Sequence, residues 1–161
     1  MREILFRGKR IDNGEWVEGD FLAPVFEGIS WILPRGEREE VKVDPSTVGQ
    51  YTGLCDKNGK KIFEGDVVKQ TFEKTVAVAT IDPWCEDEYA DLYGEDVGVV
   101  MILPSKGACI KNPVIHRAVN GDTTQDGEVV KMYKNICQGR CEVIGTIHDN
   151  PELLEVSHAT D

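Results

Sequence analysis

The sequence predicts a mainly β protein, made of small β modules that form a partly open β-barrel and end in a short helical turn. Short apolar segments with partial alternation recur along the chain, and clusters of Gly, Asn, Asp and Pro separate them. No long stretch has the i, i+3, i+4, i+7 spacing of an amphipathic helix. We expect an N-terminal β-hairpin module over residues 1–45 and a barrel-like module over residues 46–156.

The N-terminal module begins with a predicted hairpin over residues 3–22. Asn13 and Gly14 supply its turn, because this pair tolerates positive φ at both turn positions. A third strand is expected over residues 28–33. It ends at Pro34, which has no N–H to donate to a neighbouring strand.

The central stretch, residues 48–68, places two extended segments around a tight polar turn. Each flank carries a glycine where a strand would bend or let another backbone approach closely, as at Gly49 and Gly65. The expected elements are a short strand over 41–43, an extended segment over 47–52, a turn over 56–59, a bend over 64–66, and strands over 67–72 and 74–81.

Residues 82–96 form an acidic stretch with interleaved aromatic side chains, which we expect to be an irregular surface insertion. Residues 104–128 are rich in Gly, Pro, Asn, Asp and Thr, which favours loop around a short strand. Asn150 followed by Pro151 is a typical helix start. The remaining expected elements are strands over 97–103, 114–119, 129–136 and 141–147, and one or two helical turns over 151–156.

Composition limits the classes of protein to consider. Apolar residues make up 40% and charged residues 29% of the chain, within the range of a globular protein. No apolar run approaches the roughly 20 residues of a membrane span, and no signal peptide is recognised, so we expect a cytoplasmic protein. The net charge of −11 would repel nucleic acid. Five cysteines without a secretory signal favour reduced thiols.

Several blocks of sequence follow one another in a fixed order from one end of the chain to the other. They are Phe6-Arg7-Gly8-Lys9-Arg10, Gly14-Glu15-Trp16-Val17-Glu18-Gly19-Asp20, Val43-Asp44-Pro45, Val48-Gly49-Gln50-Tyr51-Thr52-Gly53-Leu54, Ile62-Phe63-Glu64-Gly65-Asp66-Val67-Val68 and Val143-Ile144-Gly145-Thr146-Ile147-His148-Asp149-Asn150-Pro151-Glu152-Leu153-Leu154. Together these blocks resemble the YopX family of small proteins encoded largely by phages and prophages. The resemblance implies a mostly β architecture and no established activity.

Glu64 and Asp66 have two interpretations. Two carboxylates separated by Gly65 could bind a divalent cation, but two acids alone do not make a cation site. The alternative is a β-bend in which the glycine takes an unusual φ and Asp66 accepts backbone amides. Cys137 and Cys141 lack the paired spacing of a zinc site, so small buried side chains explain them as well.

The acidic stretch also has two interpretations. Acids mixed with aromatic residues suit docking onto a basic protein, whereas the alternative is a solvated loop. Aromatic residues elsewhere could form a platform for nucleic-acid bases, although core packing explains them better. The binding candidates are Tyr51, Asp56, Glu64, Asp66, Trp84, Asp87, Glu88 and Asp91.

Three hypotheses follow for function. The first is a phage or prophage accessory protein without enzymatic activity, which binds a basic host or phage protein or assembles with itself into a homo-oligomer. The second is a small barrel that binds nucleic acid through residues 46–70, and the third is a metal-assisted hydrolase that uses Glu64 and Asp66. The acidic charge opposes the second hypothesis. The lack of a convergent His, Cys and carboxylate set opposes the third, so we expect no catalytic residue, metal or cofactor.

Overall fold

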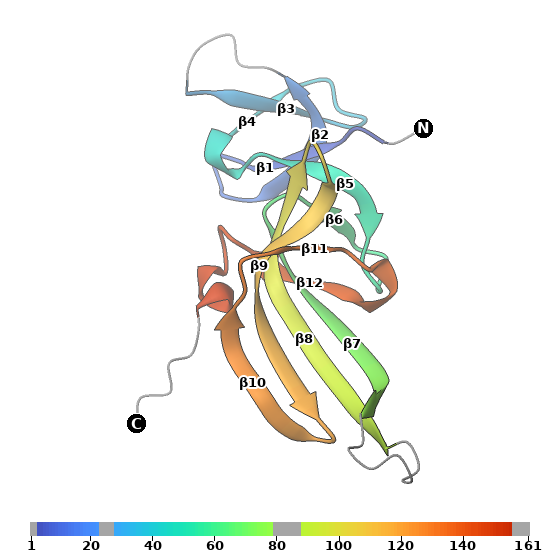
Figure 1. Ribbon diagram of the computed structural model, residues 1–161. Helices are drawn as coiled ribbons and strands as arrows, with labels where there is room; N and C mark the ends of the chain where they lie inside the picture. Colours follow the sequence, from blue (N-terminus) through green and yellow to red (C-terminus); the bar gives the residue numbers. More distant parts are fainter. Residues whose placement is uncertain (1–2, 23–27, 79–87, 156–161) are drawn as a thin grey trace.

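The computed structural model describes residues 3–22, 28–78 and 88–155, and these fold into two antiparallel β-sheets (Figure 1). The prediction of a mainly β protein is confirmed. The described strands do not close into a barrel, and the helical segments are short 3-10 turns. None of the described helices is long and apolar enough to cross a membrane.

The first sheet has the strand order β4-β3-β2-β1-β5-β6. Strands β1–β6 belong to the first sheet and strands β7–β12 to the second, so the chain passes from one sheet to the other between β6 and β7. The expected boundary between two modules after residue 45 stays a prediction. The elements of this part are β1 (Phe6–Lys9), β2 (Trp16–Leu22), β3 (Ser30–Pro34), β4 (Val41–Val43), the 3-10 turn η1 (Pro45–Thr47), β5 (Gly49–Cys55) and β6 (Lys61–Phe63).

The predicted N-terminal hairpin is present as β1 and β2, but its turn differs from the expected one. Gly14 has a φ of +73°, whereas Asn13 does not take a positive φ. The N–H of Arg10 donates to the carbonyl of Glu15 at 2.9 Å and closes a four-residue loop. A loop of this length is commonly built around a type I turn, so one left-handed residue is enough.

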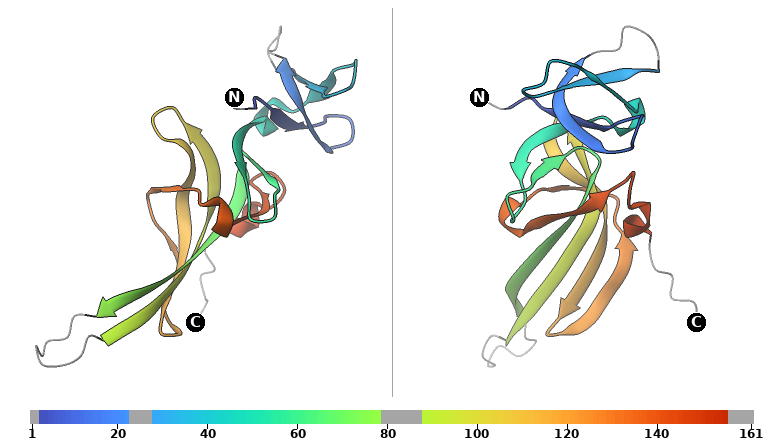
Figure 2. Two further views of the ribbon diagram at one scale, coloured as in Figure 1. Left: turned by 90° about the vertical axis from the view of Figure 1, so that its right-hand side faces the viewer. Right: turned by 180° about the vertical axis from the view of Figure 1, so that it is seen from behind.

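The second sheet has the strand order β10-β9-β8-β7-β12, and β11 also pairs with β9. Its long strands run well beyond β12 at one end (Figure 2). The elements of this part are β7 (Asp66–Val78), β8 (Glu88–Leu103), β9 (Gly107–Val119), β10 (Asp122–Val129), β11 (Tyr133–Asn135), the 3-10 turn η2 (Gln138–Arg140), β12 (Cys141–Thr146) and the 3-10 turn η3 (Pro151–Leu154).

The irregular acidic insertion expected over residues 82–96 is wrong for residues 88–96, which form the first half of β8. Asp91, Tyr93 and Glu95 alternate with residues whose side chains point to the other side of the sheet, as β-strand geometry requires. The pattern is obscured by Asp96, which is fully buried on the other side. The expected strands over 67–72 and 74–81 are one strand, β7, as far as Val78; residues 79–81 lie outside the described part.

Residues 104–128 were expected to be mostly loop, and this is also wrong. They form most of a hairpin of β9 and β10, whose two-residue turn is Asn120-Gly121 with φ of +50° and +89°. Positive φ at both positions is typical of the type I′ turn, for which Asn-Gly is the preferred sequence. Of the strand expected over 129–136, Val129 is the last residue of β10, and residues 133–135 are extended as β11.

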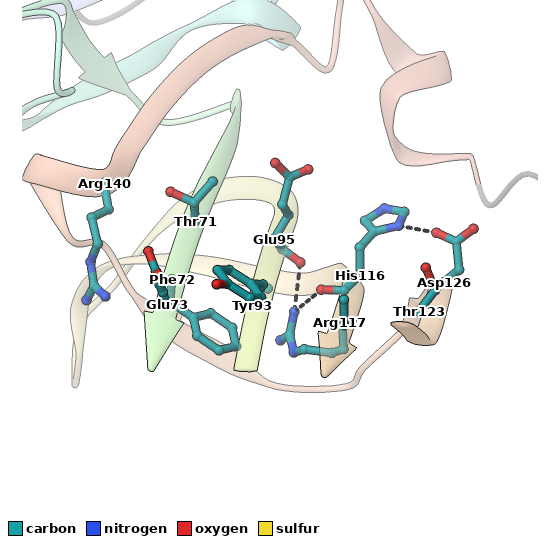
Figure 3. Close-up of a pocket in the computed structure, with 12 residues that line it drawn as sticks. Thr71, Phe72, Glu73, Tyr93, Glu95, His116, Arg117, Thr123, Asp126 and Arg140 are labelled. Carbon is teal, nitrogen blue, oxygen red and sulfur yellow. Dashed lines mark hydrogen bonds and ion pairs between the residues drawn. The ribbon is translucent and has the colours of Figure 1, made fainter. Parts of the chain in front are cut away.

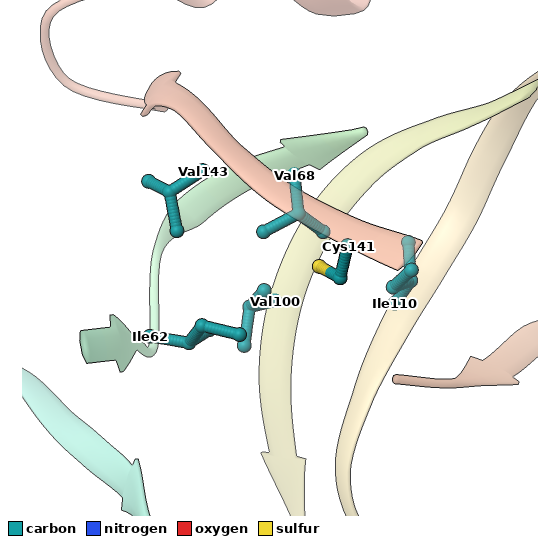
Figure 4. Close-up of a cluster of buried hydrophobic side chains, with 6 residues drawn as sticks. All are labelled: Ile62, Val68, Val100, Ile110, Cys141 and Val143. Carbon is teal, nitrogen blue, oxygen red and sulfur yellow. The ribbon is translucent and has the colours of Figure 1, made fainter. Parts of the chain in front are cut away.

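The main core is formed by side chains of β6, β7, β8, β9 and β12 (Figure 4). Cys141 is fully buried there, and burial raises the pKa of its thiol to about 12, so it behaves as a small apolar side chain. The members of this core are Ile62, Val68, Val100, Ile110, Cys141 and Val143.

A buried ion pair connects the two sheets. Arg7 on β1 contacts Asp66 on β7 with 2.5 Å between Nη2 and Oδ1, and Asp66 is fully buried. The guanidinium carbon lies 4.6 Å from the ring centre of Trp16 and 4.8 Å from that of Phe63. Asp149, after β12, accepts a hydrogen bond from the Trp16 indole at 2.8 Å. The resembling blocks therefore meet at this joint.

Candidate functional site

One side of the long strands β7–β10 is an open face, and it carries the candidate site (Figure 3). The register of the strands places directly opposite residues on the same side of the sheet, for example Glu73 opposite Tyr93 and Tyr93 opposite Ala118. The open face consists of Thr71, Glu73 and Thr75 on β7, Tyr89, Asp91, Tyr93 and Glu95 on β8, His116 and Ala118 on β9, and Thr123 and Asp126 on β10.

A shallow groove of about 560 Å³ crosses this face. Arg140, Thr71, Glu95, His116 and Asp126 lie in a row across the strands (Figure 3). Carboxylates outnumber cationic side chains along this row. The groove is therefore better suited to a cationic ligand than to an anionic one.

Two exposed tyrosines stand among these carboxylates. Tyr89 is 64% and Tyr93 is 40% exposed, and both lie on the same face of the sheet. The negative charges of Asp91 and Glu73 raise the pKa of Tyr93, which therefore remains a neutral phenol. Each tyrosine offers an apolar ring and a polar hydroxyl, a combination enriched in protein interfaces.

The opposite face of the same strands holds the sheet in shape. Asp96 is fully buried and contacts Arg117 at 2.5 Å and the ammonium of Lys134. Both cations also lie over the ring of Phe72, at 4.7 Å and 5.0 Å from its centre. Gly94 leaves room for this ring, since a Cβ there would lie 2.3 Å from Phe72 Cε1. These contacts fix β7, β8 and β9 beneath the open face.

Of the acidic candidates in the stretch 82–96, the structure places Asp91 on the open face. Its Oδ1 accepts a hydrogen bond from Thr75 at 2.9 Å. Trp84 and Asp87 lie outside the described residues, and Glu88 begins β8. Glu73, Asp126 and Arg140 were not singled out from the sequence. The Asn120-Gly121 turn was the signal that would have paired β9 with β10 and brought Asp126 to this face.

Glu64, Gly65 and Asp66 form the β-bend that was the alternative to a cation site. Gly65 has a φ of +83°. Asp66 accepts the N–H of Phe63 at 2.7 Å, and Glu64 accepts the N–H of Ile102 at 3.3 Å. Burial raises the pKa of Asp66, against the effect of Arg7. The two carboxylates are thus directed to different partners.

Tyr51 and Asp56, the other two candidates of the central stretch, are both buried. Tyr51 packs with Leu5 and Phe63, and its hydroxyl is 3.5 Å from Cys55 Sγ. Asp56 accepts N–H groups at its own turn and that of Val143 at 3.1 Å. Burial raises the pKa of Asp56, but these backbone donors outweigh it and the net shift is downward. These positions are occupied by internal contacts.

The basic residues of the stretch 46–70 are largely paired with acids. Lys57 contacts Glu142 at 2.6 Å, and Lys61 contacts Glu18 at 3.2 Å. Within the described ranges, no group of three or more His, Cys, Asp or Glu residues is placed to hold a metal ion. In the same part of the chain, Cys55, Cys109, Cys137 and Cys141 are free.

A second, smaller cavity of about 370 Å³ lies at the seam between the two sheets. Its ionisable groups come from Glu64, Lys111 and His148, and its apolar walls from β8 and Ile147. Burial lowers the pKa of His148, and the positive charges of Lys9 and Arg7 lower it further. The imidazole is therefore neutral at neutral pH, and this cavity has no strong charge preference.

Comparison of the sequence with models of known protein families shows to which family the chain belongs. A family model described as YopX protein matches residues 5–155. The chain belongs to the YopX family. The match includes the middle third of the chain, which the resembling blocks do not reach. It supports a phage-associated role without assigning a molecular activity. The chain matches no curated protein.

Proposed function

We propose that this member of the YopX family is a non-enzymatic accessory protein of a phage, which binds a basic segment of another protein through its open face. The observation that carries the proposal is the exposure of Tyr89 and Tyr93 among the carboxylates of β7, β8 and β10. Isolated exposed aromatics need no explanation, but two on one face beside a groove favour a protein interface.

Charge selects the class of partner. The chain carries a net charge of −11, and Glu73, Asp91 and Asp126 are all exposed on the open face. Such a surface attracts Lys- and Arg-rich segments over about a Debye length, roughly 8 Å at physiological ionic strength. It repels phosphate groups, which disfavours nucleic acid as the direct ligand.

The two tyrosines are expected to contribute binding affinity that the charged residues alone would not provide. Exposed ion pairs contribute little to affinity, whereas Tyr and Arg dominate the residues whose truncation weakens interfaces most. An arginine of the partner that stacks on Tyr93 would also contact neighbouring carboxylates such as Glu73. We therefore expect the partner segment to be rich in arginine.

The test begins with affinity capture from lysate of an infected or lysogenic host, with mass spectrometry of the captured proteins. The association rate of the captured partner is then measured at two ionic strengths. A variant of the open face, Glu73→Gln with Asp91→Asn, should associate more slowly and with a flatter salt dependence. Asn at position 91 can still accept the Thr75 hydroxyl, so the fold should be intact.

The matched control removes two charges from the other side of the same sheet. Asp122 and Glu128 on β10 lie opposite Val119 and Ile115, which places them on the opposite face. Asp122→Asn with Glu128→Gln changes the net charge equally and should leave the association rate closer to the wild type. Equal effects of the two variants, or the lack of any captured basic protein, would contradict the proposal.

A further inference from the structure

Among the described strands, none pairs with the outer edge of β7 over more than half of its length. β12 pairs with β7 only from Asp66 to Gln70, where Cys141 is the first residue of β12. Within the described residues, no strand continues beside the stretch from Thr71 to Ala77 (Figure 2). A long, regular sheet edge with free N–H and C=O groups is a template for another strand.

The backbone of Asp91 shows which groups on this edge are free. Its N–H donates to Asn120 Oδ1 at 2.8 Å, and its carbonyl accepts the Asn120 N–H at 2.9 Å, so both groups are directed toward β9. Thr75 lies directly opposite Asp91 in the β7–β8 pair. Opposite residues in an antiparallel pair either exchange hydrogen bonds or both point away. The N–H and C=O of Thr75 therefore point outward, and by alternation so do those of Glu73.

The other long edge of this sheet is protected. β10 has two register shifts against β9, and Gly127 within it has a φ of +70°. Bulges of this kind, together with charged side chains, are devices that prevent edge-to-edge pairing. The pairing of β7 with β8, in contrast, runs without a register shift from Val67 to Val78. Among the long strands of the described part, only the β7 edge is left regular.

We propose that the β7 edge pairs antiparallel with the β7 edge of a second copy of this chain, around a two-fold axis through Thr75. In this register Glu73 lies opposite Ala77 of the partner, and Lys74 lies opposite Val76, so no like charges meet. A two-fold axis at Glu73 would place two carboxylates directly opposite each other, and an axis at Lys74 would place two ammonium groups opposite each other. Such pairs are destabilising, so charge disfavours those two registers, whereas the Thr75 register avoids both like-charge pairs.

The proposed dimer has a consequence for the open face. A two-fold axis that relates adjacent antiparallel strands is perpendicular to the sheet, so the same side of the sheet faces the same way in both copies. Thr75 of each copy then lies beside Thr75 of the other, and Glu73 lies beside Ala77, all on the side of the open face. The dimer joins two open faces into one surface, and this inference does not depend on what that surface binds.

Disulfide cross-linking tests the register. Two Thr75→Cys residues would be directly opposite, with Cα atoms about 5.5 Å apart, within the range that a disulfide spans. Glu73→Cys is the matched control, because its two copies would be displaced by four residues, roughly 13 Å along the strands. Mild oxidation should convert Thr75→Cys to a covalent dimer well beyond the wild-type background, and Glu73→Cys should not rise above that background. Equal cross-linking of both variants would overturn the register.

Light scattering tests the dimer itself. The wild type should show twice the 17.9-kDa chain mass over the micromolar range. Thr75→Pro removes an outward N–H, the position where a strand tolerates proline, and should give a monomer with unchanged circular dichroism. Thr75→Ala keeps the N–H and should remain a dimer. A monomeric wild type, or a folded Thr75→Pro variant that is still dimeric, would overturn the proposal.

Discussion

Removing the guanidinium of Arg7 should be among the most damaging single changes to this protein. Asp66 is fully buried, and Arg7 is its charged partner at 2.5 Å. Arg7→Met would leave that carboxylate without a counter-ion in a site closed to water. Loss of one partner from a buried pair costs about 3–5 kcal/mol, a large fraction of the stability of an ordinary domain.

The contacts of the Arg7 guanidinium require an arginine rather than another cationic side chain. It lies between the rings of Trp16 and Phe63, with centres 4.6 Å and 4.8 Å away, and a planar cation stacks there better than an ammonium. Arg7→Lys should therefore recover only part of the loss. Arg7→Met combined with Asp66→Leu should recover more, because the unpaired buried charge is then removed.

Urea unfolding followed by tryptophan fluorescence measures these free energies. For a chain of this size, a loss of about 3–5 kcal/mol lowers the melting temperature by roughly 6–20 °C. Arg10→Met is the matched control, since Arg10 pairs with Asp12 on the surface and its loss should hardly change stability. A midpoint for Arg7→Met indistinguishable from that of Arg10→Met would refute the reasoning.

Three further changes test other parts of the fold, each by the same unfolding measurement. Gly65→Val should cost about 1–3 kcal/mol through the positive φ alone, because a Cβ there would meet nothing closer than 3.8 Å; an unchanged midpoint would contradict this. Gly94→Ala should cost about 1–3 kcal/mol by displacing the Phe72 ring, and Phe72→Leu should relieve part of that cost. Asp56→Asn should cost about 1–3 kcal/mol by opposing an amide to the Val143 N–H. The folded pKa of Asp56 is lowered, so its contribution is present above the unfolded value of 3.8 and is lost as the pH falls through the folded value; the variant should lack that part of the acid dependence.

The sequence by itself determined the strands whose patterns are local. The hairpin of β1 and β2, the strand ending at Pro34 and the bend at Gly65 each depend on turn residues and neighbours within a few positions. Backbone sterics of Gly, Asn and Pro act over that range, so they can be recognised without the fold. The family blocks are local in the same sense.

Only the tertiary structure decided the long sheet and its open face. Asp96 is acceptable in a strand because Arg117 and Lys134, distant in sequence, neutralise it, and Gly94 is needed because Phe72 lies across it. None of these three partners can be identified from the alternation of apolar and polar residues. The acids and the glycine of residues 82–96 therefore resembled those of a loop. Likewise, Asp91 and Asp126 share one face only because β8 and β10 both flank β9 in register. Side-chain pairing across strands, which sets which residues meet, is a property of the folded sheet.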